Sequence, residues 1–177
     1  MSSGLSGQGF GRCVALNLSG APVDSQWAML VPPGRVEGAD GRVFVNDAPD
    51  AVVGAFVKSG IAAPVDVNHS QFIKAPNGEP SPAVGWIEEL QVRVGAIWGR
   101  IEWNAAGKAA LASKAYRYIS PALRHDANGK VIAILGAGVV NRPNFAMPAL
   151  AAEQPQAVSV PKIETRNGLS TFVPRAE

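Results

Sequence analysis

Cysteine, charge and long apolar runs are all scarce in this chain. Its 177 residues include one cysteine, Cys13, which has no partner for an internal disulfide, so a reducing cytoplasm fits best. Charged residues make up 17% and the formal net charge is +2, too little to predict binding to nucleic acid or to a membrane surface. No apolar run reaches the length of a membrane span, and the small, polar N-terminus does not resemble a secretory signal.

The rest of the composition is typical of one folded domain. Apolar residues make up 47% of the chain, and its length suits a single domain with a sizeable core. We expect residues 1–11 to be a mobile tail and residues 12–150 to fold as one domain. Residues 151–177 show no sustained hydrophobic period and are interpreted as a linker and C-terminal tail.

Short strands dominate the predicted secondary structure, as judged by apolar alternation and by turn residues. One helix is expected between Pro49 and Gly60, and a second is expected to begin at Asn104. The fold class is therefore mainly β (α+β), a compact barrel with a few peripheral helices. The main predicted strands are Cys13–Leu18, Trp27–Val31, Val43–Val45, Ala63–Val67, Val84–Val92, Ala96–Trp103, Tyr116–Ile119 and Val131–Leu135.

Three local predictions concern the segments that carry chemistry. The strand Tyr116–Ile119 is expected to end at Ser120, where Pro121 would force a turn. Gly136 and Gly138 are expected to break the following strand. The residues from Ser70 to Pro82 are rich in proline and are predicted to form a surface loop beside a substrate groove.

Ser120 and His69 are the candidate nucleophile and base. A free serine is barely nucleophilic near neutral pH and needs a base within hydrogen-bond reach, and the chain has only two histidines. His69 follows a predicted buried strand, whereas His125 lies beside the turn Asp126–Gly129 and is more typical of a solvated loop residue. Most serines and histidines in such positions are not catalytic. The serine hydroxyl usually bonds to the local backbone, and the histidine usually has a structural role.

Several short blocks resemble a known family, the Mu-like phage I proteins, which are prohead (capsid maturation) proteases of Mu-type phages and prophages. The order and spacing of the blocks match the family over roughly residues 30–150. The blocks that carry the resemblance are Val65–His69, Pro82–Ile87, Trp98–Trp103, Tyr116–Pro121 and Val139–Pro143.

The resemblance implies a fold similar to the herpesvirus assemblin-type serine proteases, with Ser120 as nucleophile and His69 as general base. A third polar group must orient the imidazole. Asn141 lies about where related phage proteases present that group, and it is favoured slightly over Asp66. Residues three apart on an extended strand point to opposite faces, so Asp66 would need a bend to reach His69. His125 is a weaker third candidate.

The implied function is a serine endopeptidase that needs no cofactor. Its implied substrates are the phage scaffold protein and the major capsid protein, in the bacterial host cytoplasm within the assembling prohead, and self-association as a dimer is expected. The family's usual long helical scaffold region does not follow the protease blocks here. A catalytically silent capsid assembly or scaffold module is therefore the alternative. A metal-dependent hydrolase, built on Asp66, His69, His125 and Asp126, is a third hypothesis.

Overall fold

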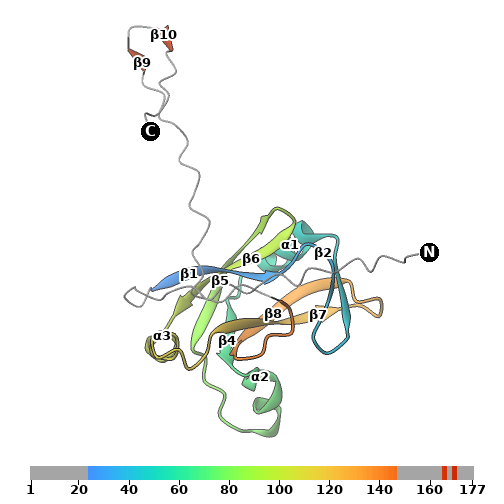
Figure 1. Cartoon of the computed structure of the whole chain (residues 1–177), viewed down its shortest axis with the longest axis vertical. Helices are drawn as coiled ribbons and strands as arrows, with labels where there is room; N and C mark the ends of the chain where they lie inside the picture. The colour runs from blue at the N-terminus through green and yellow to red at the C-terminus, as the bar shows by residue number, and fades with distance from the viewer. Residues whose placement is uncertain (1–23, 147–164, 167–168, 171–177) are drawn as a thin grey trace, which may run out of the picture.

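A six-stranded sheet forms the centre of the computed structural model, which describes residues 24–146, 165–166 and 169–170 (Figure 1). The predictions for Cys13, for the first strand and for most of both tails lie outside the described residues. The elements in chain order are β1 (Ser25–Val31), β2 (Gly34–Glu37), β3 (Val43–Asn46), α1 (Pro49–Ser59), β4 (Ala63–Val67), α2 (Ser70–Ile73), the 3-10 turn η1 (Ala75–Asn77), β5 (Gly85–Arg93), β6 (Ala96–Trp103), α3 (Ala105–Ala112), β7 (Tyr118–His125), β8 (Val131–Val140), β9 (Thr165–Arg166) and β10 (Leu169–Ser170).

The strand order in this sheet is β1-β6-β5-β4-β8-β7. Neighbouring strands are antiparallel except β4 and β8, which are parallel. The two outer strands, β1 and β7, also contact each other, so the sheet curls towards a barrel. A separate hairpin, β2–β3, lies against β8. A bridge between Val45 of β3 and Lys130, just before β8, links the two. The prediction of a mainly-β fold with few helices is confirmed.

The two longer helices lie where the sequence predicts, although α1 begins after Ala48 without a side-chain cap. In α1, Pro49 occupies the first turn, and Gly60 closes the helix in a left-handed conformation with φ 64°. In α3, the side chain of Asn104 accepts a hydrogen bond from the backbone N–H of Gly107 at 3.0 Å. Within the part of the chain that the structure describes, no helix is long and apolar enough to cross a membrane.

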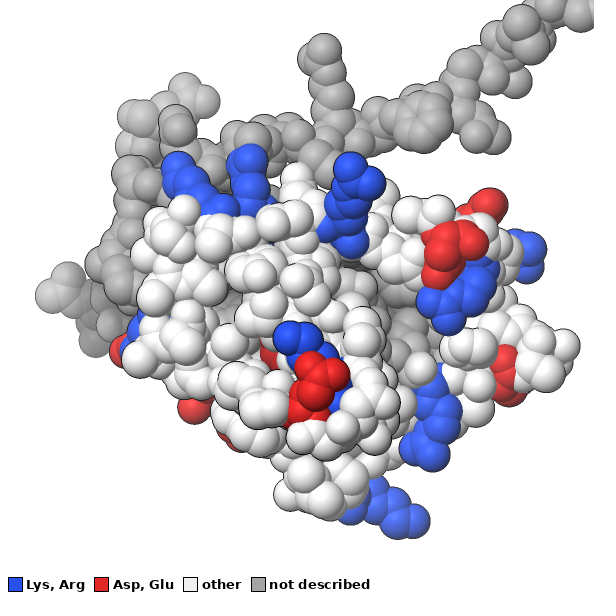
Figure 2. All heavy atoms as spheres, turned by 90° about the horizontal axis from the view of Figure 1, so that it is seen from below, with Lys and Arg blue, Asp and Glu red and all other residues white. Residues whose placement is uncertain are grey.

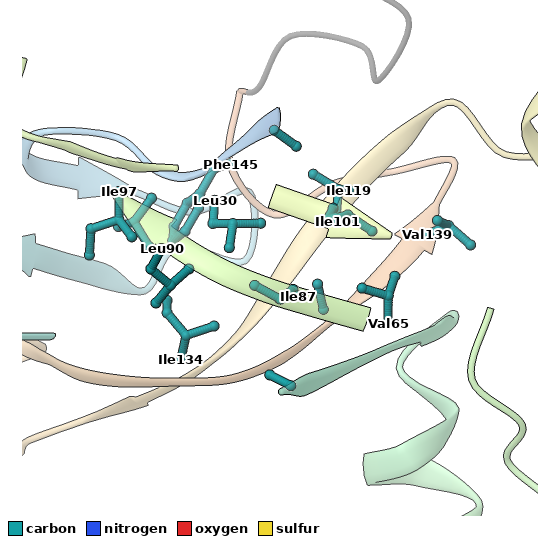
Figure 3. Packing of buried hydrophobic residues seen from close by; sticks show 14 of the residues in the cluster. Leu30, Val65, Ile87, Leu90, Ile97, Ile101, Ile119, Ile134, Val139 and Phe145 are labelled. Atoms are coloured by element: carbon teal, nitrogen blue, oxygen red, sulfur yellow. The ribbon is translucent and has the colours of Figure 1, made fainter. Parts of the chain in front are cut away.

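Alternation along the strands builds the core on one face of the sheet (Figure 3). In β6, Ile97 and Ile101 are fully buried and Trp103 is buried. Glu102, which lies between Ile101 and Trp103 in the sequence, faces solvent. Helix α1 packs against β5, β6 and β8 and contributes the buried Val52. The most deeply buried large side chains of the core are Phe145, Leu30, Ile87, Ile97, Ile101, Ile119, Val31, Val52, Val65 and Val139.

The local predictions for the strands around Ser120 were wrong. Strand β7 does not end at Ser120 but runs through Pro121 to His125. Proline is tolerated there because β7 is the outer strand of the order, so its missing N–H removes no bond to a further strand. Strand β8 likewise continues through Gly136 and Gly138. The segment after His69 is also not a plain loop, because it contains α2 and η1.

The turn between β5 and β6 leads to a prediction about stability. Val94 and Gly95 both have positive φ, 49° and 75°, and the side chain of Val94 is 99% exposed. A β-branched residue is strained in this conformation, whereas asparagine tolerates it in two-residue hairpin turns. We expect Val94→Asn to raise the free energy of unfolding by about 1 kcal/mol, as measured by urea denaturation.

Gly95→Ala is the matched control at the next position. It should lower the free energy of unfolding, because φ is positive and the added Cβ would lie 3.2 Å from Cβ of Pro33. A loss of stability in Val94→Asn would contradict the proposed strain at this turn.

Candidate functional site

An open cleft with a volume of about 630 Å³ contains both Ser120 and His69. Segments from several elements line it. Strands β7 and β8 contribute Ser120 and Leu135, the segment from His69 into α2 contributes Phe72, and the turn before β3 contributes Arg42. The segment after β8 completes the lining with Arg142, Pro143, Asn144 and Phe145.

Ser120 is the third residue of β7 and is 5% exposed. Its Cα lies opposite that of Gly138 in the antiparallel pairing of β7 with β8. Directly opposed residues in such a pair present their side chains on the same face of the sheet. Among the described residues, no hydrogen bond ties the Ser120 hydroxyl to another group, so the hydroxyl is available to a ligand in the cleft.

His69 reaches the same face through a sharp turn after β4. Asn68 and His69 are both left-handed, with φ 54° and 58°. Asparagine and histidine adopt this conformation more readily than most residues. The turn starts α2 directly, because the carbonyl of His69 accepts hydrogen bonds from the backbone N–H groups of Phe72 and Ile73 at 2.9 and 3.1 Å. The chain therefore bends back over the sheet after Val67 instead of continuing away from it.

Gly138 lies between the two candidate residues. It pairs with Ser120 of β7 on one side and with Asp66 of β4 on the other. A Cβ added to Gly138 would lie 2.8 Å from the backbone nitrogen of His69, 3.2 Å from its Cγ and 3.2 Å from Oδ1 of Asp66. Only a glycine leaves enough room here for His69 to lie against β8 beside the side chain of Asp66. Ser120, His69 and Asp66 thus gather around one position of β8.

Asp66 is 1% exposed, and its two carboxylate oxygens have different surroundings. Oδ2 accepts a hydrogen bond from the backbone N–H of Gln71 at 2.7 Å. Oδ1 is buried and has no hydrogen-bond partner among the described residues. A buried polar atom without a partner is costly and needs an explanation. The turn at Asn68 and His69 supplies the bend that Asp66 needs to approach the imidazole.

Burial lowers the pKa of His69 below its usual value of 6.5, and the nearby negative charge of Asp66 partly opposes that shift. Burial acts in this direction because it disfavours the charged imidazolium. The imidazole is therefore neutral near pH 7, which is the form that can accept a proton.

The two other candidates for the third polar group, Asn141 and His125, are not held beside His69. The amide of Asn141 donates a hydrogen bond to the carbonyl of Ala115 at 3.0 Å, and Asn141 does not line the cleft. His125 lines the cleft but lies five residues along β7 from Ser120, which is about 16 Å at the usual strand rise. Its Nδ1 lies 2.9 Å from the carbonyl oxygen of Asp126, and its ring meets Phe44 edge to face at 5.3 Å.

No metal centre is visible in the described part of the chain. Within these residues no three His, Cys, Asp or Glu side chains come together in a way that could hold an ion. The set of Asp66, His69, His125 and Asp126 is therefore not gathered into a metal site.

The sequence analysis missed two residues that shape the site, Gly138 and Gln71. Gly138 was interpreted as a strand break, although a glycine inside a β-branched strand can also mark a close approach of another backbone. The sequence therefore already contained a signal for the close approach at Gly138. Gln71 acts through its backbone N–H, and no feature of its side chain could have revealed this role.

A protein-family model described as "Mu-like prophage I protein, N-terminal domain" matches residues 28–151. The matched span includes Asp66, His69, Ser120 and the cleft. No curated protein and no solved structure matches the chain.

The packing around Gly138 predicts the effect of adding one methyl group. We expect Gly138→Ala to lower the free energy of unfolding by about 2 kcal/mol, because the added atom must displace the backbone of His69. Gly54→Ala in α1 is the control, since nothing lies within 4 Å of the added atom. It should raise stability by about 0.5–1 kcal/mol. Thermal and urea unfolding would measure the stability of both variants. An unchanged free energy of unfolding in Gly138→Ala would contradict the close packing at Gly138.

The pKa of His69 tests whether Asp66 faces the imidazole. Removing the carboxylate charge with Asp66→Asn should lower this pKa further, because the negative charge currently raises it. NMR titration of the ring protons would measure the change, and His125 provides an internal reference signal in a chain with two histidines. An unchanged or raised pKa in a variant with native circular dichroism would show that the carboxylate does not act on His69.

Proposed function

This chain belongs to the Mu-like prophage I protein family, and we propose that it is a serine endopeptidase acting in the maturation of a phage prohead. The observation that carries the proposal is the placement of Ser120 and His69 in one cleft, with the buried Asp66 beside His69 at Gly138. These are the residue types that serine hydrolysis requires. Ser120 comes from β7, Asp66 from β4 and His69 from the turn after β4.

In the proposed mechanism, the hydroxyl of Ser120 attacks the carbonyl carbon of the scissile peptide bond. The neutral imidazole of His69 accepts the hydroxyl proton and then donates it to the leaving amine. Water hydrolyses the resulting acyl-enzyme, with His69 acting as base once more. The lowered pKa of His69 supports this role, because it keeps the base unprotonated at neutral pH.

Asp66 is the third member that we propose, in preference to Asn141. Oδ1 of Asp66 is the buried acceptor without a partner, and the imidazole needs an acceptor for its second ring nitrogen. A carboxylate in that position orients the ring and stabilises the imidazolium formed during attack. The side chain of Asn141 is held instead at the carbonyl of Ala115, to which its Nδ2 donates a hydrogen bond.

The cleft suits a polypeptide substrate. It is open to solvent and combines apolar side chains such as Phe44, Phe72 and Leu135 with polar groups at its rim. We propose the phage scaffold protein and the major capsid protein as substrates, in the cytoplasm of the bacterial host within the assembling prohead. Self-association as a dimer is part of the proposal, and no cofactor is required.

One observation favours a second candidate function, a catalytically silent assembly module. No hydrogen bond joins the hydroxyl of Ser120 to His69 among the described residues. Catalytic hydrogen bonds are often loose before substrate binds, so the endopeptidase remains the first proposal.

The test compares wild type with Ser120→Ala and His69→Gln, each co-expressed with a phage scaffold protein. Wild type should cleave the scaffold, and each variant should lose activity by roughly 10⁴-fold or more. Ser113→Ala is the matched control, because the hydroxyl of this exposed serine only caps α3 by bonding to Ala110. Intact mass and gel analysis would measure cleavage, and a fluorophosphonate probe would report the reactive serine directly.

Each outcome separates the candidate functions. Scaffold cleavage and probe labelling that depend on Ser120 and His69 would support the serine endopeptidase. Equal cleavage in all variants would rule out the assignment of these residues. Absence of both cleavage and labelling in wild type would favour the silent assembly module.

A further inference from the structure

We infer that the cleft selects peptides in which an acidic side chain lies next to apolar residues, and that Arg142 binds the acidic side chain. The inference rests on the proposed function and names the substrate class of the same site. Three observations carry it: the charge balance of the cleft, the anchoring of Arg142 and the apolar side chains nearby.

The charge balance leaves one arginine of the cleft without a counter-ion. Apart from its two histidines, the charged residues lining the cleft are Asp40, Arg42 and Arg142. Nε and Nη2 of Arg42 both contact Oδ2 of Asp40 at 2.6 Å. The same arginine lowers the pKa of Asp40. The carboxylate therefore stays charged and balances the positive charge of Arg42. Arg142 is exposed and forms no ion pair with any residue that the structure describes.

Arg142 is attached to an anchored segment. It follows the end of β8 at Val140, close to the strand position that faces Ser120. Two residues later, the carbonyl of Asn144 accepts a hydrogen bond from the backbone N–H of Ala39 at 2.7 Å. Phe145 is then fully buried and meets Phe44 edge to face at 5.2 Å. These contacts hold the backbone of Arg142 at the rim of the cleft, so its guanidinium reaches a restricted region.

Apolar side chains occupy the rest of the cleft. Phe72 is 45% exposed and Leu135 is 40% exposed, although both are large and apolar. Both line the cleft together with Phe44 and Pro121. Burying these surfaces under a bound peptide would favour apolar residues on either side of the acidic one. A guanidinium matches the geometry of a carboxylate with two parallel hydrogen bonds, which a neutral amide cannot reproduce.

The face of the molecule seen in Figure 2 does not suggest a polyanion as the ligand. Figure 2 shows one face of the molecule, on which most atoms belong to uncharged residues and the Lys and Arg side chains form no continuous patch. Nucleic acids bind through many phosphate contacts rather than one cation. A single free arginine in an apolar cleft fits one carboxylate of a peptide better.

The test profiles cleavage sites in a peptide library made from a digested bacterial proteome, with the products identified by mass spectrometry. Wild type should enrich Asp or Glu at one fixed distance from the cleaved bond. Arg142→Gln should lower kcat/KM for an acidic peptide by about tenfold and leave the matched peptide with glutamine unchanged. Arg142→Glu should favour Lys or Arg at that position. Arg124→Gln is the control, because Arg124 is exposed on β7 but does not line the cleft.

The outcomes distinguish this inference from the function on which it rests. Ser120-dependent cleavage without an acidic preference would overturn the inference and leave the endopeptidase in place. An equal loss for all peptides in Arg142→Gln would also overturn it, because that result places Arg142 in the chemistry or the fold. No cleavage of any peptide by wild type would count against the proposed function and the inference together.

Discussion

The close contact between β8 and the turn after β4 is the constraint on which the site depends. At Gly138 the backbone nitrogen of His69 comes so near the sheet that no Cβ fits between them. Interiors are close-packed, so such an approach cannot be relaxed by a small local adjustment. The parallel pairing of β4 with β8 sets the level of Asp66, and the antiparallel pairing of β7 with β8 sets the level of Ser120. One glycine thus keeps three polar side chains together.

Burying Asp66 beside this contact costs stability. A carboxylate that is 1% exposed and has one oxygen without a partner is a poor choice if stability alone matters. Strained or unsatisfied groups are concentrated at functional sites, where other interactions hold them in place. Here the short helix α2 provides that support. The backbone N–H of Gln71 donates to one carboxylate oxygen of Asp66, and the side chain of Gln71 donates to the carbonyl of Ser81 at 2.9 Å.

Contacts between segments distant in sequence hold one wall of the cleft together. The turn before β3 is tied to the segment after β8 through Asn144, and Phe44 and Phe145 pack below that tie. A substrate would therefore meet a preformed surface on this side. Preorganisation of this kind lowers the entropic cost of binding an extended peptide.

The sequence by itself determined the mainly-β class, the C-terminal cap of α1, the N-terminal cap of α3, the hairpin turns and the short set of residues able to act in catalysis. These features depend on local rules: strand alternation, helix capping at Asn104 and the scarcity of histidine. Only the tertiary structure decided how Asp66, His69 and Ser120 are arranged. Two left-handed residues reverse the chain, and pairing between strands distant in sequence brings Gly138 beneath His69. Local patterns carry no information about such contacts, so Gly138 and Pro121 were interpreted from sequence as breaks in strands that in fact continue through them.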